Sequence, residues 1–375
     1  MHEREEFDVL VRGEGCVGRA LALALSAQGL RVALLGQGEP APAREDLRTY
    51  ALNAASVALL RELRVWDALP ADAASPVYEM QVQGDHVAGS AGQLEFSAWQ
   101  QGVGELAHIV DAAALEQQLG AAIGFAPHIK RVAAPVPARL SALCEGRDSA
   151  GRAALGVRFE RHAYGQSAIA ARLVAQEPHQ GVARQWFRAP DVLALLPFER
   201  PEPQRSYGLV WSLPQARADE LLAAGAAEFE SALLEATGGA VGPLRLAGGR
   251  AAWPLAHARA DRVSGPGWVL LGDAAHLVHP LAGQGLNLGL ADVAALAGVI
   301  RAREAWRPLG DERLLRRYAR ARSLPNWAMG ELTDGLLRVF ANDTPLLRGL
   351  RNEGMGLINR LPPLKRWLTG RALGA

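Results

Sequence analysis

F-D-V-L-V-R-G-E-G-C-V-G-R-A-L-A-L-A-L-S-A-Q-G-L-R-V-A-L-L, residues 7–35, has the pattern of one β-α-β unit. Residues 7–12 form a short apolar run that is typical of a buried strand, and residues 30–35 form a second one. Between them a helix is expected to follow the glycine-rich loop and to end near Gly29. Two strands joined by a helix within ~30 residues predict a Rossmann-like parallel sheet.

The loop of this unit carries three glycines, Gly13, Gly15 and Gly18, in the G-x-G-x-x-G spacing. The first glycine permits a tight turn, the second lets a pyrophosphate approach the backbone, and the third lets the helix pack closely on the strand. The helix N-terminus adds N–H donors and the positive end of a dipole. This context favours a dinucleotide site over a chance glycine turn. Cys16 is interpreted as a small packing residue rather than an acidified thiol.

Composition sets broad limits on the class of protein. The 375 residues suffice for two domains, or for one large domain with an insertion. A net charge of +1 gives no global electrostatic case for nucleic acid. Two cysteines without metal-type spacing argue against a disulfide scaffold. No apolar run reaches the ~18–20 residues that span a bilayer.

Hydrophobic periodicity predicts the remaining elements. Helices are expected at 47–60, 111–123, 214–224, 226–236 and from about 285, and strands within 77–110, within 166–212 and from 268. The strand-like runs at 166–212 have hairpin spacing, which predicts an antiparallel sheet.

These elements predict an α/β fold with an α+β substrate side. A Rossmann-like nucleotide-binding domain would be assembled from discontinuous segments, interrupted by an antiparallel β-sheet substrate domain, with a helical C-terminus. The expected boundaries are 1–76, 98–165 and 245–335 for the nucleotide domain, 77–97 and 166–244 for the β-sheet domain, and 336–375 for the C-terminal region.

A second motif occupies residues 269–292, V-L-L-G-D-A-A-H-L-V-H-P-L-A-G-Q-G-L-N-L-G-L-A-D. A strand brings Asp273 to its carboxyl end, where the carboxylate suits a sugar or ribityl hydroxyl. The following loop opens a helix whose glycines expose N–H groups to an electron-rich ligand edge. His276 and His279 lack a nearby third ligand, so no metal site is expected.

The two motifs together resemble the FAD-dependent aromatic hydroxylases with the p-hydroxybenzoate hydroxylase fold. H-P-L-A-G-Q-G-L-N-L-G-L is closely similar to the ubiquinone-biosynthesis hydroxylases within them, which act on polyprenylated phenol rings. Further similarities are D-L-R-T-Y-A-L-N-A-A-S (46–56), R-Q-W-F…L-A-L-L-P-F (184–198) and R-L-P-P-L-K-R (360–366). The resemblance covers nearly the whole chain.

The resemblance implies a set of cofactor-binding residues. Gly13, Gly15 and Gly18 would receive the FAD pyrophosphate, Arg48 would contact the cofactor, and Asp273 beside Gly272 would bind the ribityl chain. The residues expected to line the isoalloxazine are Pro280, Gly283, Gln284, Gly285, Leu286 and Asn287. A helix N-terminus there would stabilise the anionic reduced flavin.

The chain departs from the family pattern at two places in the adenosine half. The second strand ends in Gly36 and Gln37, where the family has an acid that binds the adenosine ribose; Gln37 is the candidate neutral substitute. Replacing Gly36 with Glu is therefore expected to tighten FAD binding. The family's A-D-G motif corresponds to a segment with Glu145 for Asp and with Gly146 retained. There is also room for only about one short strand between the helix at 111–123 and Cys144.

The resemblance implies a flavin-dependent monooxygenase that hydroxylates an aromatic ring, in ubiquinone biosynthesis a polyprenylated phenol, by way of a flavin C4a-hydroperoxide. NAD(P)H is the expected transient reductant. No acid–base pair is evident, and the candidate pocket residues are His276, His279, Trp186 and Trp253. One alternative is a cofactor-poor homologue that serves as a scaffold in a quinone-biosynthesis complex. The other is an NAD-dependent dehydrogenase, which the missing ribose acid disfavours more strongly.

The C-terminal part of the chain is basic. Residues 301–375 contain 15 Arg and Lys against 7 Asp and Glu. Leucines at roughly helical spacing with interleaved arginines fit a helix packed on the domain, or alternatively a helix docked on a membrane surface or a biosynthetic complex. We expect a small-molecule aromatic or polyprenyl substrate, no nucleic-acid partner, and a cytoplasmic location or one peripheral to the inner membrane.

Overall fold

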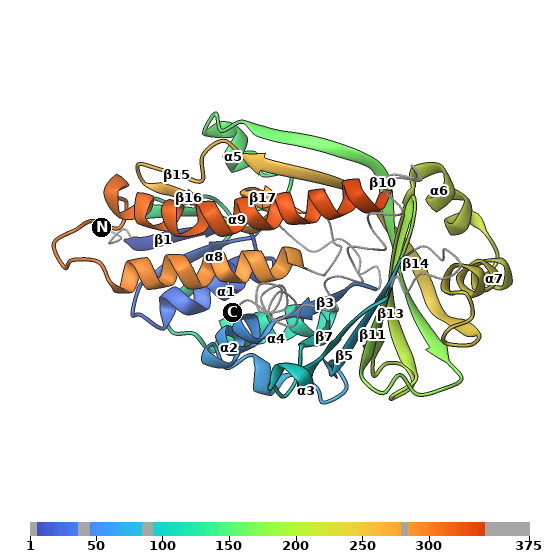
Figure 1. Cartoon of the computed structure of the whole chain (residues 1–375). Coiled ribbons are helices and arrows are strands. Elements are labelled where there is room, and N and C mark those ends of the chain that lie inside the picture. Colours follow the sequence, from blue (N-terminus) through green and yellow to red (C-terminus); the bar gives the residue numbers. More distant parts are fainter. Residues whose placement is uncertain (1–5, 37–45, 85–92, 279–283, 342–375) are drawn as a thin grey trace.

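Three sheets and the helices around them make up the part of the chain that the structure describes, which is residues 6–36, 46–84, 93–278 and 284–341 of a computed structural model. A parallel sheet with its helices forms one half of the molecule, and a large, mainly antiparallel sheet forms the other (Figure 1). A three-stranded sheet lies between them. The α/β fold class with an antiparallel insertion is confirmed.

The first sheet contains the β-α-β unit predicted from residues 7–35. Its strands lie in the order β15 (Ser264–Gly265), β16 (Trp268–Leu270), β9 (Ala138–Leu143), β1 (Phe7–Arg12), β2 (Val32–Leu35) and β8 (Ile129–Val132). All neighbours are parallel except β15 and β16. The segment before Cys144 thus contributes two strands, β8 and β9, where about one was expected. Both extend this sheet.

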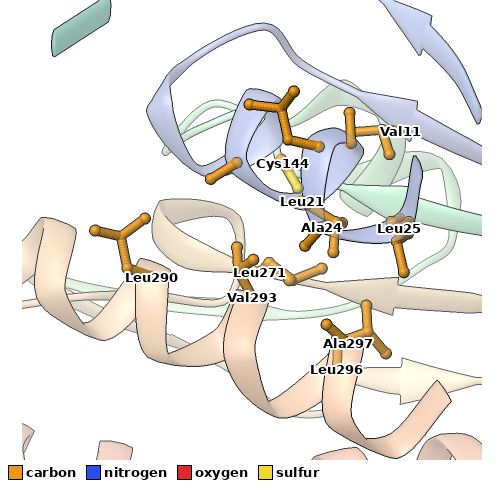
Figure 2. Packing of buried hydrophobic residues seen from close by; sticks show 14 of the residues in the cluster. Val11, Leu21, Ala24, Leu25, Cys144, Leu271, Leu290, Val293, Leu296 and Ala297 are labelled. Atoms are coloured by element: carbon orange, nitrogen blue, oxygen red, sulfur yellow. The ribbon is translucent and has the colours of Figure 1, made fainter. Parts of the chain in front are cut away.

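Helices α1 (Cys16–Ser26) and α8 (Gln284–Arg301) pack together against this sheet and form its main core (Figure 2). Leu21, Leu25 and Leu296 have no exposed surface. Burying each such side chain contributes about 1.5–3 kcal/mol. The close approach of α8 depends on Gly289, since a Cβ there would lie 2.5 Å from Cγ2 of Val17.

The large sheet contains the predicted antiparallel strands. Its order is β17 (His276–Leu277), β14 (Leu244–Ala260), β10 (Phe159–Ala175), β13 (Ser206–Pro214), β12 (Asp191–Phe198), β11 (Val182–Arg188), β5 (Glu79–Gln83) and β6 (Gln93–Ser97). Helices α6 (Gln215–Ala223) and α7 (Ala226–Thr237), both predicted, cover its outer face (Figure 1). Its other face is turned toward the parallel sheet.

The predicted helix at 47–60 is wrong in its first half. Thr49–Leu52 is strand β3, which pairs with β7 (Ala107–Asp111), and β4 (Ala74–Val77) completes the three-stranded sheet. Helix α2 begins only at Ala54 because the side chain of Asn53 caps it, accepting the N–H of Ser56 at 2.9 Å. Pairing with a distant strand overrides the local helical pattern.

The other helices agree with expectation where one was made. Asp111 caps α4 (Ala112–Phe125) by accepting the N–H of Ala114 at 2.8 Å. The further helices are α2 (Ala54–Glu62), α3 (Ala98–Gln101), α5 (Ala150–Ala154), α9 (Glu312–Ala341) and the short 3-10 helices η1 (Trp66–Ala68) and η2 (Gly272–Ala274). Among the described helices, none combines the length and apolar character needed to cross a bilayer.

The predicted domain boundaries stay a prediction. Strands β10 and β14 run without interruption across the expected boundaries at 165 and 244, and helix α9 runs across the one at 335. The chain therefore passes between the two halves of the molecule within single elements rather than through linkers.

Candidate active site

A cavity of about 800 Å³ lies between the parallel sheet and the large sheet. Its wall on the first side comes from segments that directly follow β1, β9 and β16, such as Gly13, Cys144 and Leu271. The carboxyl ends of adjacent parallel strands meet at one edge of a sheet, which is where α/β proteins bind ligands. The order of the strands in the sheet, β16-β9-β1, thus explains why residues so distant in sequence share this wall.

The three glycines of the first loop have distinct packing roles. Gly13 has φ 108°, and a Cβ there would collide with the carbonyl of Cys144. A Cβ on Gly18 would collide with the carbonyl of Gly13. A Cβ on Gly15 would meet no protein atom within 4 Å, and Gly15 lines the cavity. Two glycines therefore permit the turn, and the third leaves space on the ligand side.

The N-terminus of α1 is open toward this space. Its N-cap, Gly15, provides no side-chain hydrogen bond, and the first turn contains no acidic residue. The first N–H groups of a helix have no intrahelical acceptor, so an anionic ligand can satisfy them. This uncapped terminus beside an open glycine fits the pyrophosphate of a dinucleotide.

Cys16 does not behave as an activated thiol. It is buried in the core, and burial together with the nearby Glu116 raises the pKa of its thiol to about 12. Desolvation therefore outweighs the effect of the helix N-terminus. The interpretation of Cys16 as a packing residue agrees with this environment.

Arg48 lines the cavity at the end of the segment that precedes β3. Its guanidinium binds Asp46 through two hydrogen bonds, Nε to Oδ1 at 2.8 Å and Nη2 to Oδ2 at 2.6 Å, and Nη2 lies 3.4 Å from Glu116. The hydrogen bonds to Asp46 raise the pKa of Arg48 above its ordinary value. Arg48 is thus a fixed positive charge at the cavity, held between two carboxylates.

Glu145 and Gly146 also line the cavity, but the carboxylate of Glu145 is engaged within the protein. Oε2 accepts hydrogen bonds from Ser149 Oγ at 2.5 Å and from the Gly151 N–H at 2.8 Å, and Oε1 lies 2.9 Å from Nε of Arg12. The side chain is only 8% exposed. Glu145 therefore secures the start of α5 rather than offering a free acceptor to a ligand.

Asp273 lies in η2, directly after β16, and projects into the cavity. Its side chain is exposed to the cavity, yet protein surrounds it closely enough that desolvation raises the pKa of the carboxyl, against the opposing charges of His276, Arg147 and Arg48. Gly272 precedes it with φ 58°. A carboxyl group in this position is suited to hydrogen-bond a polyhydroxyl chain.

The start of helix α8 contributes Gly285 and Leu286 to the cavity. The side chain of Asn287 is used elsewhere: Oδ1 accepts from Ser56 Oγ at 2.7 Å and from the Asn53 N–H at 3.1 Å, while Nδ2 donates to the carbonyl of Ala51 at 2.8 Å. This amide ties α8 to β3 and α2. Gln37, His279, Pro280 and Gly283 lie outside the described residues, and Gln284 is described only as the first residue of α8.

His276 is not brought to the cavity wall. Its Nε2 lies 2.7 Å from Oδ2 of Asp292, and both side chains are buried. Arg322 binds the other oxygen of Asp292, Nε to Oδ1, at 2.6 Å. The three residues form a buried ionic network beneath η2.

The wall on the second side is a row of residues across four strands. Pairing places Ala170 beside Val210, Val210 beside Ala194, and Ala194 beside Gln185, and all four line the cavity. Trp253 of β14 lines it as well. Small apolar side chains dominate this wall, which suits an apolar ligand.

Trp186 lies on the opposite face of the same strands. In the next row it pairs with Leu193, which pairs with Trp211, and these side chains pack against Phe229 and Leu233 of α7. Successive residues of a strand point to opposite faces, so Gln185 faces the cavity and Trp186 does not. The structure therefore places one candidate tryptophan, Trp253, at the cavity and the other in the core.

Several polar residues at the cavity do not belong to the predicted set: Glu14, Arg147, Arg161, Arg184 and Gln185. Arg184 Nη1 donates to the hydroxyl of Tyr207 at 3.1 Å, and Tyr207 belongs to the core on the outer face of the sheet together with Trp186. Burial raises the pKa of Tyr207, which keeps it a neutral phenol. The alternation of β11 could have indicated Gln185 only once the inward face was known, and it places the Arg184 side chain on the same face as Trp186. Within the described ranges, no three His, Cys, Asp or Glu side chains form a metal-type cluster.

The chain is similar to known proteins over nearly its whole length. The FAD binding domain family, FAD_binding_3, matches residues 126–333. The chain is 31% identical to "Ubiquinone hydroxylase UbiL" of Rhodospirillum rubrum, covering 98% of this chain and 89% of that protein. It is also 31% identical to "3-demethoxyubiquinol 3-hydroxylase" of Escherichia coli, covering 98% of each. The crystal structure of p-nitrophenol 4-monooxygenase PnpA from Pseudomonas putida superimposes with a TM-score of 0.76 at 15% identity, covering 99% and 98% of the chains.

An uncapped helix at a glycine loop, a cavity carboxylate after β16 and an apolar sheet wall define an FAD-dependent oxidoreductase with the fold of the aromatic monooxygenases. The chain belongs to the FAD binding domain family and is a flavin-dependent monooxygenase with FAD as its cofactor.

Proposed function

We propose that this monooxygenase hydroxylates the aromatic ring of a polyprenylated phenol in ubiquinone biosynthesis, with NAD(P)H as the reductant. The observation that carries the proposal is one continuous cavity, which extends from the open glycine loop to a wall of small apolar residues on the large sheet. The names of the two 31%-identical relatives support the substrate class.

The residues at the first side of the cavity would hold the cofactor. Gly13 and Gly15 with the N–H groups of α1 would receive the pyrophosphate, Asp273 the ribityl chain, and Arg48 would add a positive charge. Gly285, at the start of α8, would approach the isoalloxazine ring. Once bound, FAD supplies the transfer of one oxygen atom from O₂ to the ring.

The second side would hold the substrate. Ala170, Ala194 and Val210 would contact apolar parts of the substrate and exclude water from the reacting ring. Gln185, on the cavity face beside Ala194, is a polar side chain in this wall and would orient a ring oxygen. Positioning and exclusion of water are the tasks that remain to the protein when a cofactor carries the difficult chemistry.

A cofactor-poor scaffold in a quinone-biosynthesis complex is the second candidate. The observation that favours it is Glu145, whose carboxylate is occupied by Arg12, Ser149 and Gly151 and so leaves the adenosine half with fewer acceptors. The visible spectrum of the purified protein separates the two candidates. A colourless protein that takes up no added FAD would favour the scaffold and contradict the monooxygenase.

The reaction itself is tested with the FAD-loaded protein, NAD(P)H, a detergent-dispersed polyprenyl phenol and isotopically labelled O₂. We expect a product heavier by one labelled oxygen atom, and oxidation of NAD(P)H that the substrate accelerates. A protein that oxidises NAD(P)H equally fast with and without the phenol, and yields no labelled product, would contradict the proposed substrate.

We also propose that the basic C-terminal region, 336–375, brings the enzyme to its lipid-borne substrate at an anionic membrane surface. The excess of Arg and Lys in residues 301–375 supports this. Vesicles containing anionic lipid should sediment the full chain at low salt and release it at high salt, whereas neutral vesicles should not bind it. Equal binding to both would contradict an electrostatic contact.

A further inference from the structure

The carboxylate of Glu14, a residue that lines the cavity, lies against Gly36. Glu14 follows the first glycine of the loop after β1, and Gly36 directly follows the adjacent strand β2. A Cβ built on Gly36 would lie 2.5 Å from Oε2 of Glu14 and 2.9 Å from its Cδ. The backbone of Gly36 does not have positive φ, so the close atoms are those of the Glu14 side chain, whose end would have to shift to admit a Cβ at position 36. The Glu14 carboxylate occupies the position where a side chain on residue 36 would begin.

We propose that Glu14 supplies the carboxylate for the adenosine ribose of FAD, in place of an acidic residue at the end of β2. The inference rests on FAD occupying the cavity as proposed above. Glu14 lines that cavity beside Gly13 and Gly15. Its side chain therefore reaches from the pyrophosphate loop to the end of β2, the position at which a Rossmann-type site binds a ribose.

Arg131 of β8 holds this carboxylate in place. Its Nε donates to Oε1 of Glu14 at 3.0 Å, and β8 is the strand next to β2, with Arg131 paired to Leu34. The oxygen beside Gly36 is the other one, Oε2. One oxygen is thus fixed by the guanidinium, while the second lies beside Gly36 at the end of β2. The positive charge also offsets the repulsion between Glu14 and a nearby pyrophosphate.

This arrangement reverses the expectation that Gly36→Glu tightens FAD binding. A side chain at position 36 has to displace the Glu14 carboxylate, and the second carboxylate would repel the first. Gly36→Glu alone therefore gives no gain. Combined with Glu14→Ala, it restores an acid at the end of β2 and removes the obstruction, so the double variant should recover the affinity that Glu14→Ala loses.

The experiment measures dissociation constants for FAD, ADP and FMN with the wild type, Glu14→Ala, Gly36→Glu and the double variant. FAD and ADP contain the adenosine ribose, and FMN does not. Loss of a charge-assisted hydrogen bond should weaken FAD and ADP binding to Glu14→Ala by about 10- to 100-fold and leave FMN unchanged. Glu62→Ala is the matched control, because it removes a carboxylate paired with Arg301 at 3.3 Å on the exposed surface.

If Glu14→Ala binds FAD as tightly as the wild type does, and ADP as tightly as the wild type does, the role of Glu14 is overturned while the monooxygenase function stands. A wild type that binds no FAD would overturn the proposed function as well. If Glu14→Ala does not fold, Glu14→Gln keeps the shape of the side chain and removes its charge. An unchanged ADP affinity in Glu14→Gln, or an equal loss for ADP and FMN, would likewise overturn the inference.

Discussion

Nε2 of His276 lies 2.7 Å from Oδ2 of Asp292, a carboxylate with no exposed surface. The same oxygen accepts the N–H of Gly272 at 2.9 Å, and Oδ1 accepts from Arg322. Asp292 thereby joins α8, α9 and the strand end that carries Asp273. Burial alone would raise the pKa of Asp292, but His276 and Arg322 outweigh burial and lower it.

We expect Asp292→Asn to destabilise the fold by about 3–5 kcal/mol, because it leaves the buried cation Arg322 without its anionic partner. Urea denaturation of both proteins at neutral pH measures the difference. His276→Asn, which keeps the Asp292–Arg322 pair, should cost less. An equal loss in both variants would contradict a dominant role for Arg322.

The contribution of Asp292 to the free energy of unfolding also depends on pH. Because its pKa is lowered in the folded state, the stabilisation is fully present above the unfolded value of about 3.9 and is lost as the pH falls through the lower folded value. The stability difference between wild type and Asp292→Asn should therefore shrink as the pH falls below about 4. A difference that grew on acidification would have the wrong sign for a depressed pKa.

Replacing Glu145 with Asp, the family residue at this position, should destabilise the protein. Glu145→Asp is one methylene too short to reach Arg12 and the Gly151 N–H together, so we expect a loss of about 1–2 kcal/mol in unfolding free energy. FAD titration of the folded variant tests whether Glu145 also contributes to cofactor binding. A stable Glu145→Asp protein with tighter FAD binding would show that Glu145 is a weakened cofactor ligand rather than a structural residue.

Much of the fold could be predicted from local sequence. The β-α-β unit has strong apolar periodicity and glycine punctuation, and helices such as α4, with Asp111 at its N-cap, carry their start signals in the chain. Thr49–Leu52 could not be predicted in this way, since its conformation depends on pairing with β7, far along the chain. When a strand forms because it pairs with a distant strand, its own sequence carries no local signal that distinguishes it from the helix that follows.

The positions of site residues could be predicted where a motif determines the backbone. The hydrogen-bond partners of their side chains could not. Gly15 and Asp273 lie at the cavity as their motifs imply. Asn287 belongs to the same motif, yet its amide binds Ser56, which no spacing reveals. The proximity of Glu14 to Gly36 likewise arises from two adjacent strand ends. It becomes visible only when β1 and β2 are placed side by side.

The two candidate tryptophans should respond to substitution in opposite ways. Trp186 is 1% exposed in the core beneath α7, so Trp186→Ala should cost about 3–5 kcal/mol of stability. Trp253→Ala, at the half-buried cavity wall, should leave stability within about 1 kcal/mol and raise the KM for the phenol. Thermal denaturation and steady-state kinetics of both variants give the comparison. A reversed pattern would mean that the inward face of the sheet is misassigned.

Ala194 offers the most direct test of the apolar wall as the substrate site. It lies at the centre of the row between Gln185 and Val210, and its Cβ faces the cavity. Ala194→Trp should fill that space and lower kcat/KM for a long-chain phenol by at least about tenfold. The dissociation constant for FAD should stay within about twofold, since the cofactor residues lie on the other side of the cavity. Ala194→Ser, which adds only one atom, is the control and should retain activity. If Ala194→Trp instead releases FAD and leaves substrate kinetics unchanged, cofactor rather than substrate occupies this wall.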